Sequence, residues 1–211
     1  MKFNIDCNRC PRLVSFLARI RRDYPGYHGR PVPSFGDPDP DLLIVGLAPG
    51  LHGANATGRP FTGDYAGILL YSTLYEFGFS SRPDSIALDD GLRLYGCRIT
   101  NAVKCVPPEN KPSGSEVNNC NAYLRAELED LRKGAVILAL GTVAHGAVLR
   151  ALGLPLTAYK FSHGAVHAPE NGTTLVDSYH CSRYNTQTGR LTPAMFHEVF
   201  RQVVRLTGRT A

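Results

Sequence analysis

The sequence has no run of about 18 apolar residues, so no segment is predicted to span a membrane. Its first residues lack the apolar stretch of a secretory signal peptide, and we therefore expect a cytoplasmic protein. No internal repeat or low-complexity segment is found. The sequence also has no large excess of charge of one sign. Its net charge of +5 is only weak evidence for a polyanionic partner. A chain of 211 residues with 43% hydrophobic residues is expected to form a single domain, residues 1–211.

The common nucleotide-binding signatures are absent as well. The glycine-rich stretch 46–64 contains neither a P-loop nor the dinucleotide fingerprint G-x-G-x-x-G. It nevertheless follows an apolar run at 42–45, predicted to be a buried strand, and precedes a helix predicted over 68–77. Ligands of open α/β sheets bind at the carboxyl ends of strands, where glycines let the backbone approach closely. Loop 46–64 is therefore predicted to be functional, and a long structural loop is the alternative.

Strands and helices alternate along the chain. Apolar or alternating runs predict four strands, at 42–45, 97–104, 135–140 and 173–176. Helical spacing and capping residues predict helices that begin near Pro11, Ile68, Ser113, Val143 and Thr192. The predicted fold is a three-layer α/β/α sandwich around a central, mainly parallel four-stranded sheet. The loops after the strands should gather on one edge, which would bring loop 46–64 together with Asn101 and His180.

Six cysteines in a cytosolic protein indicate metal or redox chemistry rather than disulfides. Cys7 and Cys10 form a C-x-x-C pair at a predicted helix N-terminus, and Cys105 and Cys120 follow at a wider spacing. Four thiols could hold zinc or a [4Fe–4S] cluster, and the spacing alone favours neither. The alternative is that one or two of the four are ordinary buried cysteines. Cys97 is predicted to be a buried strand residue.

Several segments together resemble the family-5 uracil-DNA glycosylases. The run from Gly46 to Asp64 resembles their first motif, and the run from His180 to Thr192 resembles their second. Residues 100–105 resemble the strand that carries their base-reading asparagine. The resemblance covers nearly the whole chain. It implies hydrolysis of the N-glycosidic bond of uracil in DNA on a four-stranded parallel sheet between helices, and we expect the protein to act as a monomer.

The cysteine spacing matches the iron–sulfur site shared by families 4 and 5. The resemblance therefore implies a structural [4Fe–4S] cluster, and this interpretation outranks zinc. Its ligands would be Cys7, Cys10, Cys105 and Cys120.

The resemblance and the chemistry of uracil together assign roles to the site residues. Asn101 can donate and accept through one amide, which matches uracil O4 and N3–H. His180 is predicted to donate a hydrogen bond to uracil O2 and stabilise the leaving anion. Phe61 is the candidate for stacking on the flipped base, and a core anchor is its alternative. The predicted base-binding set also includes Gly46, Ala48 and Gly50.

The loop after His180 is predicted to contact DNA. Ser182 and Arg183 suit phosphates, and Tyr184 could wedge into the stack that the flipped base has left. Cys181 stands where the family motif has proline, and its loss loosens the backbone beside His180. A Cys181–His180 nucleophile pair is disfavoured, because adjacent residues on an extended chain point to opposite faces.

Two other positions depart from the wider superfamily. Ala48 stands where better-known members carry an aspartate general base, so water must be positioned by another group. Asp64 is the preferred candidate and Asn55 the alternative, although Asp64 could equally be a helix N-cap. Gly50 stands where a bulky tyrosine blocks the thymine methyl group. A roomier pocket should therefore accept larger lesions such as hypoxanthine and etheno-cytosine.

Two hypotheses from other classes remain open. A catalytically silent iron–sulfur module that binds nucleic acid would explain the missing carboxylate at Ala48, although Asn101 and His180 argue against it. A redox protein is the third hypothesis. It would show reversible reduction of its cluster and no base release.

Overall fold

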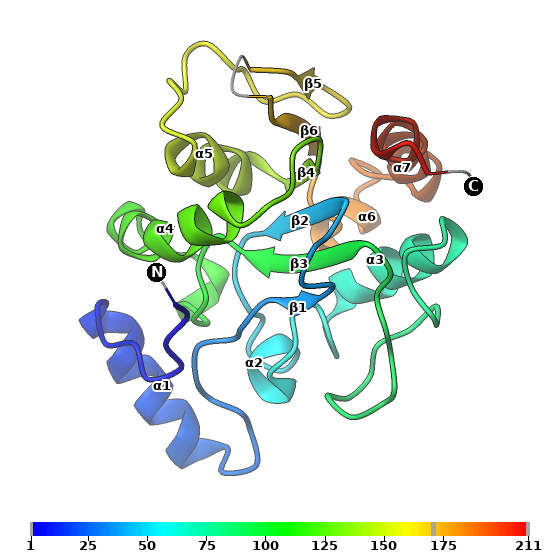
Figure 1. The fold of residues 1–211 in the computed structure, drawn as a ribbon. Helices are drawn as coiled ribbons and strands as arrows, with labels where there is room; N and C mark the ends of the chain where they lie inside the picture. Colours follow the sequence, from blue (N-terminus) through cyan, green and yellow to red (C-terminus); the bar gives the residue numbers. More distant parts are fainter. Residues whose placement is uncertain (1, 170–171, 210–211) are drawn as a thin grey trace.

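The computed structural model describes residues 2–169 and 172–209, and within them the chain forms one sheet of six strands (Figure 1). Its four central strands are parallel: β3 (Cys97–Asn101), β2 (Leu42–Gly46), β4 (Val136–Leu140) and β6 (Thr174–Ser178). These four strands confirm the predicted mainly parallel sheet. Two-residue strands, β1 (Phe35–Gly36) and β5 (Val166–His167), add antiparallel edges that were not predicted, because so short a strand has no detectable periodicity.

Helices cover both faces of the sheet (Figure 1). One face is covered by α4 (Gly114–Glu129) and α5 (Thr142–Ala151), and α5 packs on β4 and β2. Helix α1 (Pro11–Asp23) lies beside α4 (Figure 1). The other face is covered by α3 (Tyr65–Glu76) and α7 (Pro193–Thr207). Three short helices lie in loops: α2 (Ala54–Thr57), the 3-10 helix η1 (Pro108–Asn110) and α6 (Arg183–Gln187). The arrangement confirms the predicted three layers.

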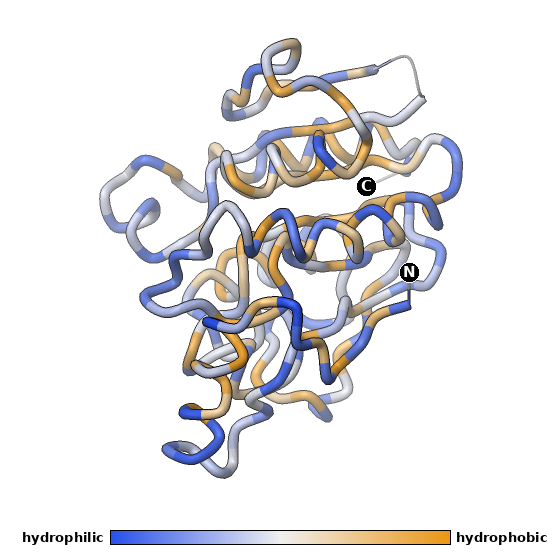
Figure 2. Tube along the Cα trace, turned by 90° about the vertical axis from the view of Figure 1, so that its left-hand side faces the viewer, coloured by the Kyte–Doolittle hydropathy of each residue, from blue (hydrophilic) through white to orange (hydrophobic). Residues whose placement is uncertain are grey.

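The alternation of side chains along β2 divides the core into two halves. Leu42 and Ile44 point into the cluster under α3 and α7, whereas Leu43 and Val45 point into the cluster under α4 and α5. All five residues of β2 are buried, as expected for a parallel strand covered on both faces. Figure 2 shows apolar segments running through the centre of the molecule, with polar segments concentrated in the loops around it.

Local signals placed two helix starts correctly. Ser113 caps α4 in a capping box, because its hydroxyl accepts from the Glu116 amide and the Glu116 carboxylate accepts from the Ser113 amide. Thr192 caps α7, where its hydroxyl accepts from the amide of Met195. Both signals lie within a single turn of helix, which is why the sequence reveals them.

Other boundaries were predicted less well. The strand predicted over 97–104 ends at Asn101, where the chain turns, and the amides of Ala102 and Val103 bond to the carbonyl groups of Gly46, the last residue of β2, and of Leu47. Helix α3 begins at Tyr65 rather than at Ile68. Tyr75 of this helix is 52% exposed and therefore lies outside the core.

None of the helices that the structure describes is long and apolar enough to cross a membrane.

Candidate active site

A cavity of about 570 Å³ opens at the carboxyl ends of the central strands. Its wall includes Ala48 from the loop after β2, Asn101 at the end of β3, Leu140 at the end of β4 and His180 just after β6. The prediction that these loops meet on one edge of the sheet is therefore confirmed. Parallel strands make this inevitable, because all their carboxyl ends lie at the same edge.

Two polar atoms in the cavity wall are buried and have no hydrogen-bond partner in the described part of the chain. One is Oδ1 of Asn101 and the other is Nδ1 of His180. Burial lowers the pKa of His180 to about 4, so its imidazole is neutral at pH 7. The backbone at His180 is fixed by Asn185, whose side-chain amide donates to the His180 carbonyl at 2.8 Å. Unpaired buried polar atoms are costly, and a pair in one cavity indicates a ligand that bonds to both.

Phe61 lies in the same wall with its ring against His180. The two ring centroids are 5.9 Å apart and the planes are inclined by 24°. Phe61 is only 5% exposed and belongs to the core under α3, so it is both a core anchor and a surface of the cavity. Its φ of +58° is unusual for a bulky residue, and such strain is concentrated at functional sites.

Gly46 supports the site from behind. A Cβ atom at Gly46 would lie 2.6 Å from Cζ of Phe61 and closer still to Oδ1 of Asn101. Gly46 does not itself line the cavity in the described structure, although it was predicted to be in the base-binding set. Its function in the geometry is to let the two side chains approach the end of β2.

Asp64 also reaches the cavity. It occupies the N-cap position of α3, but its side chain does not cap that helix and instead accepts from the amide of Ala54 at 3.0 Å. Burial raises the pKa of Asp64. A Cβ at Gly50 would lie 3.1 Å from Cγ of Asp64, and one at Gly53 would lie 2.7 Å from Oδ2. The glycines of this loop therefore make room for a buried carboxylate.

Asn55 lies in α2 and does not line the cavity. Asn55 is fully buried, and its side-chain amide donates to the carbonyl of Leu51 at 3.2 Å. Ala48 is in the cavity wall, as predicted. Among the cavity-lining residues that the structure describes, Asp64 is the only carboxylate. Of the two candidates for positioning a water molecule, Asp64 therefore reaches the cavity and Asn55 does not.

The three residues predicted to contact DNA line the cavity. Tyr184 is 70% exposed, and the guanidinium of Arg183 lies 5.5 Å from the ring centroid of Tyr65. The hydroxyl of Ser182 caps α6 by accepting from the amide of Asn185, so this hydroxyl is engaged within the protein. The sequence predicted a loop here, whereas the structure forms the short helix α6 with Arg183 and Tyr184 in its first turn.

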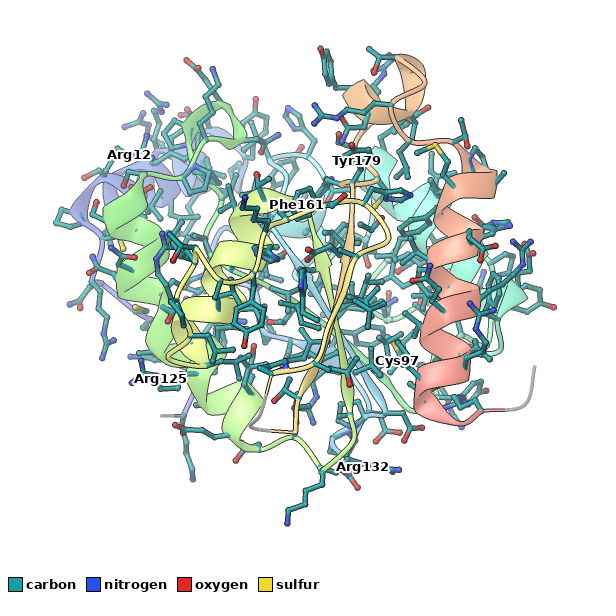
Figure 3. The ribbon with its side chains drawn as sticks, turned by 90° about the horizontal axis from the view of Figure 1, so that it is seen from above. Arg12, Cys97, Arg125, Arg132, Phe161 and Tyr179 are labelled. Carbon is teal, nitrogen blue, oxygen red and sulfur yellow. The ribbon has the colours of Figure 1, made fainter. Side chains whose placement is uncertain are left out.

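Sequence reasoning missed two aromatic residues of the wall. Phe161 and Tyr179 line the cavity with ring centroids 6.2 Å apart (Figure 3). Tyr179 could have been found, because it directly precedes His180 at the end of a predicted strand. Phe161 lies in the segment before β5 that carries no motif, and only tertiary packing brings it to the site.

Sequence reasoning also missed a buried ion pair, which holds loop 46–64 in position. Arg59 and Asp90 are joined at 2.8 Å, with both side chains almost completely buried. Burial alone would raise the pKa of Asp90, but hydrogen bonds from Arg59 and from backbone amides hold that pKa well below its usual range. Arg59 also donates to the hydroxyl of Ser85 at 3.0 Å. Loop 46–64 is thereby tied to the irregular segment around residues 85–90.

The four predicted ligand cysteines converge away from the cavity. Cys7, Cys10, Cys105 and Cys120 line one small pocket at the junction of α1 and α4. The amide of Lys104 donates to Sγ of Cys120 at 3.3 Å. Burial, with the neighbouring thiols, raises the pKa of Cys105, and burial raises that of Cys120 to about 11.

The spacing of these sulfurs tests which group they fit. A single zinc ion with Zn–S bonds of about 2.3 Å needs its four sulfurs about 3.8 Å apart. In the described chain, the only three His, Cys, Asp or Glu side chains with ligand atoms within 4.8 Å of one another include no cysteine. Four cysteines around one pocket, no three of which have sulfurs within 4.8 Å of one another, fit a larger metal cluster better than a single zinc ion.

The other two cysteines lie in the core under α3 and α7, fully buried. Cys97 confirms its prediction as a buried strand residue. Burial raises the pKa of Cys181 to about 12, so its thiol does not ionise near neutral pH and a Cys181–His180 nucleophile pair is not supported. Cys181 fills a core position beside His180.

Comparison with known proteins decides the family. The family described as "Uracil DNA glycosylase superfamily" matches residues 33–204, which include every residue of the cavity wall named above. The chain belongs to the uracil-DNA glycosylase superfamily.

Individual relatives in this superfamily define the branch more closely. A type-5 uracil-DNA glycosylase from Thermus thermophilus is 49% identical over 207 residues, which is 96% of this chain and 94% of the relative. A type-5 uracil-DNA glycosylase from Pyrobaculum aerophilum is 45% identical, over 97% of this chain and 90% of the relative. A type-4 uracil-DNA glycosylase from Archaeoglobus fulgidus is 34% identical over 66% of this chain and 62% of the relative. These matches confirm the family-5 resemblance read from the motifs.

Proposed function

We propose that this protein is a DNA-repair enzyme that hydrolyses the N-glycosidic bond of uracil flipped out of DNA and leaves an abasic site. The observation that carries the proposal is the pair of buried, unpaired atoms in one cavity, Oδ1 of Asn101 and Nδ1 of His180. Each unpaired group costs about 1–3 kcal/mol, which a bound base that bonds to both would recover. The names of the type-5 relatives support the same substrate.

Asn101 is the proposed reader of the base. Its Oδ1 can accept from N3–H of uracil while its amide group donates to O4. Cytosine presents the opposite pattern at these two atoms and would leave the amide mismatched. The ring of Phe61, held by the core and by its contact with His180, offers a flat surface on which the base can stack.

His180 is the proposed stabiliser of the leaving group. Breaking the glycosidic bond places negative charge on the base and positive charge on the sugar. A neutral imidazole, as expected from the lowered pKa, can donate one hydrogen bond to uracil O2 while that charge develops. Because the donor is already buried and oriented, little reorganisation is needed during the reaction.

Asp64 is the proposed group for water. Its Oδ2 is held by the Ala54 amide, and the carboxylate reaches the cavity where the sugar would lie. An ionised carboxylate at this point can orient a water molecule and stabilise the positive charge on the sugar. It takes the place of the carboxylate that is missing at Ala48.

The residues at the mouth of the cavity are proposed to hold DNA. Extracting the base costs a few kcal/mol in unstacking, and Tyr184 could occupy the space it leaves. Arg183, at the start of α6, can contact phosphate. Ser182, whose hydroxyl caps α6, is proposed to place the start of this helix against the DNA strand. A cavity of about 570 Å³ also supports acceptance of hypoxanthine and etheno-cytosine.

We further propose that Cys7, Cys10, Cys105 and Cys120 hold a [4Fe–4S] cluster. Its role would be structural: the ligands come from the start of α1, from α4 and from the segment between β3 and α4, which it would join. The chemistry of base release does not involve it. Replacing Cys120 by serine should remove iron and the brown absorbance, whereas Cys97→Ser, at a buried cysteine outside the pocket, should keep both. Full iron content in the Cys120 variant would contradict the assignment.

Base release tests the main proposal. The purified protein is incubated with a duplex that contains one U·G pair or one hypoxanthine, and abasic sites are then cleaved with alkali. We expect strand cleavage that falls sharply in Asn101→Ala and His180→Ala. Matched controls are Asn118→Ala and His197→Ala, at positions outside the cavity, which should keep activity.

Two outcomes would refute parts of the proposal. No cleavage by protein that retains its brown absorbance would favour the nucleic-acid-binding module. Cleavage of uracil without hypoxanthine would refute the broader lesion range.

The monomeric state and the cytoplasmic location stay predictions, and light scattering tests the first of them.

A further inference from the structure

Three side chains converge outside both the cavity and the cysteine pocket. His145 comes from α5, His167 from β5 and Asp177 from β6, and their ligand atoms lie within 4.8 Å of one another. Nδ1 of His145 is 2.8 Å from Oδ1 of Asp177, and Nε2 of His167 is 3.0 Å from Oδ2. The carboxylate is completely buried, so each of its oxygens faces a different imidazole in an interior site.

The two contacts of the His145 ring require a second proton or a metal ion at this site. Its Nε2 lies 2.9 Å from the carbonyl oxygen of Tyr159, which can only accept, so Nε2 carries a hydrogen. Its Nδ1 faces a second acceptor, the carboxylate of Asp177. A neutral imidazole has one donor and one acceptor, so a lone pair of Nδ1 would face a lone pair of the carboxylate. Either a second proton or a metal ion must lie between them.

The hydrogen bond on the other side of the His145 ring matches that of metal-binding histidines. Such histidines donate the N–H of the other ring nitrogen to a carboxylate or a backbone carbonyl, which fixes the tautomer and the ring orientation. The bond from His145 to the Tyr159 carbonyl is of this kind. His167 is the most accessible of the three, with a side chain 13% exposed.

We propose that His145, His167 and Asp177 form a site for a divalent transition-metal ion of the zinc class. The ligands would be Nδ1 of His145, Nε2 of His167 and the carboxylate of Asp177, with water in a fourth position. Imidazole with carboxylate suits zinc and its neighbours better than magnesium or calcium. Ligand atoms around tetrahedral zinc lie about 3.3 Å apart, so each imidazole nitrogen needs to move from its carboxylate oxygen by only a few tenths of an ångström.

The location indicates what the ion would do. His145 lies 5.7 Å from Phe161 between ring centroids, and Phe161 lies against Tyr179 in the cavity wall (Figure 3). The site is thus behind the wall and does not reach the cavity. A bound ion would join α5 to β5 and β6. The inference is independent of the reaction proposed for the cavity.

Metal binding by the cluster-loaded protein tests the site, because occupied cysteines cannot compete for the added ion. The protein is first treated with a mild chelator and then titrated with Zn²⁺ by calorimetry and with Co²⁺ by visible absorption. We expect one ion per chain, a cobalt spectrum of nitrogen and oxygen ligands without thiolate bands, and release of protons on binding. Zn²⁺ should also raise the melting temperature.

Variants locate the binding. Asp177→Asn and His167→Gln should each weaken the affinity at least about tenfold, whereas His197→Gln, at a histidine elsewhere in the structure, should not. His167→Gln is the safer variant, because its partly exposed position can accept glutamine without loss of the fold. Base release by this variant should stay within about twofold of the wild type.

Two results would overturn the proposal. The first is the absence of saturable Zn²⁺ and Co²⁺ binding by the wild-type protein, which would show that a proton alone lies between His145 and Asp177. The second is binding that keeps its full affinity in both Asp177→Asn and His167→Gln, which would place the ion elsewhere.

Discussion

Replacement of Gly46 by alanine should separate activity from stability. The added Cβ would lie 2.6 Å from Cζ and 2.8 Å from Cε2 of Phe61, and closer than either to Oδ1 of Asn101. Ordinary contact at this position begins near 3.4 Å, so the Phe61 ring must move by about 0.8 Å and the Asn101 amide by at least as much. Both of these side chains are proposed to bind the base.

The expected magnitudes follow from which atoms must move. The crowded atoms are the far ends of two side chains that face a cavity, so the structure can relax. The free energy of unfolding should therefore fall by only about 1–2 kcal/mol. That corresponds to a fall in melting temperature of about 2–8 °C. A displacement of about 1 Å in the groups that position a substrate can reduce the rate about 100-fold. We therefore expect a large loss of kcat/KM with a small loss of stability.

The assay is single-turnover base release from a U·G duplex, with thermal melting of the same preparations. Gly26→Ala is the matched control, because a Cβ at Gly26 would meet nothing within 4 Å and its φ is not in the left-handed region. That variant should keep both activity and stability. Wild-type kcat/KM in Gly46→Ala would refute the assignment of Phe61 and Asn101 to the base site. A melting temperature that falls by 15 °C or more would refute the claim that the clash is relieved locally.

Three further predictions concern pH and the support of the first motif. The rate of base release should show no inflection near pH 6.5 that depends on His180, because its pKa is lowered to about 4; an inflection there that disappears in His180→Gln would contradict a neutral donor. Asp64→Asn should lower activity yet raise the melting temperature at pH 7, since burial raises the pKa of Asp64 above 3.8 and its charged form therefore destabilises the fold. This gain should shrink as the pH falls through the raised pKa and vanish below about pH 3.8, so an equal gain at pH 3 would refute the cause. Arg59→Ala leaves Asp90 buried without its partner and should cost about 3–5 kcal/mol, seen as a lower urea midpoint, whereas Arg201→Ala breaks an exposed pair and should change that midpoint little.

Much of the fold could be predicted because its signals are local. The four central strands are short apolar or alternating runs, and two helix starts carry capping residues within one turn. Parallel strands place the loops that follow them on one edge, so Asn101 and His180 could be assigned to one site without coordinates. The motif residues then identified the family, which the comparisons confirm.

The exact ends of these elements depended on contacts between segments. Nothing near Asn101 in the sequence indicates that β3 must stop there, because the residues that follow it bond to Gly46 and Leu47 at the end of β2, more than 50 residues earlier. The two-residue edge strands likewise exist only because a neighbouring strand supplies their hydrogen bonds.

The sequence by itself therefore determined the order of elements, the parallel sheet and the family, and it named the principal candidate residues of the site. Only the tertiary structure decided that Asp64 rather than Asn55 reaches the cavity, and that Phe61 is both anchor and wall. It alone joined Arg59 to Asp90 and brought His145 to Asp177, across 31 and 32 residues of sequence. The physical reason is that strands and caps are specified by neighbours along the chain, whereas the burial and pairing of a polar side chain depend on which distant segments pack around it.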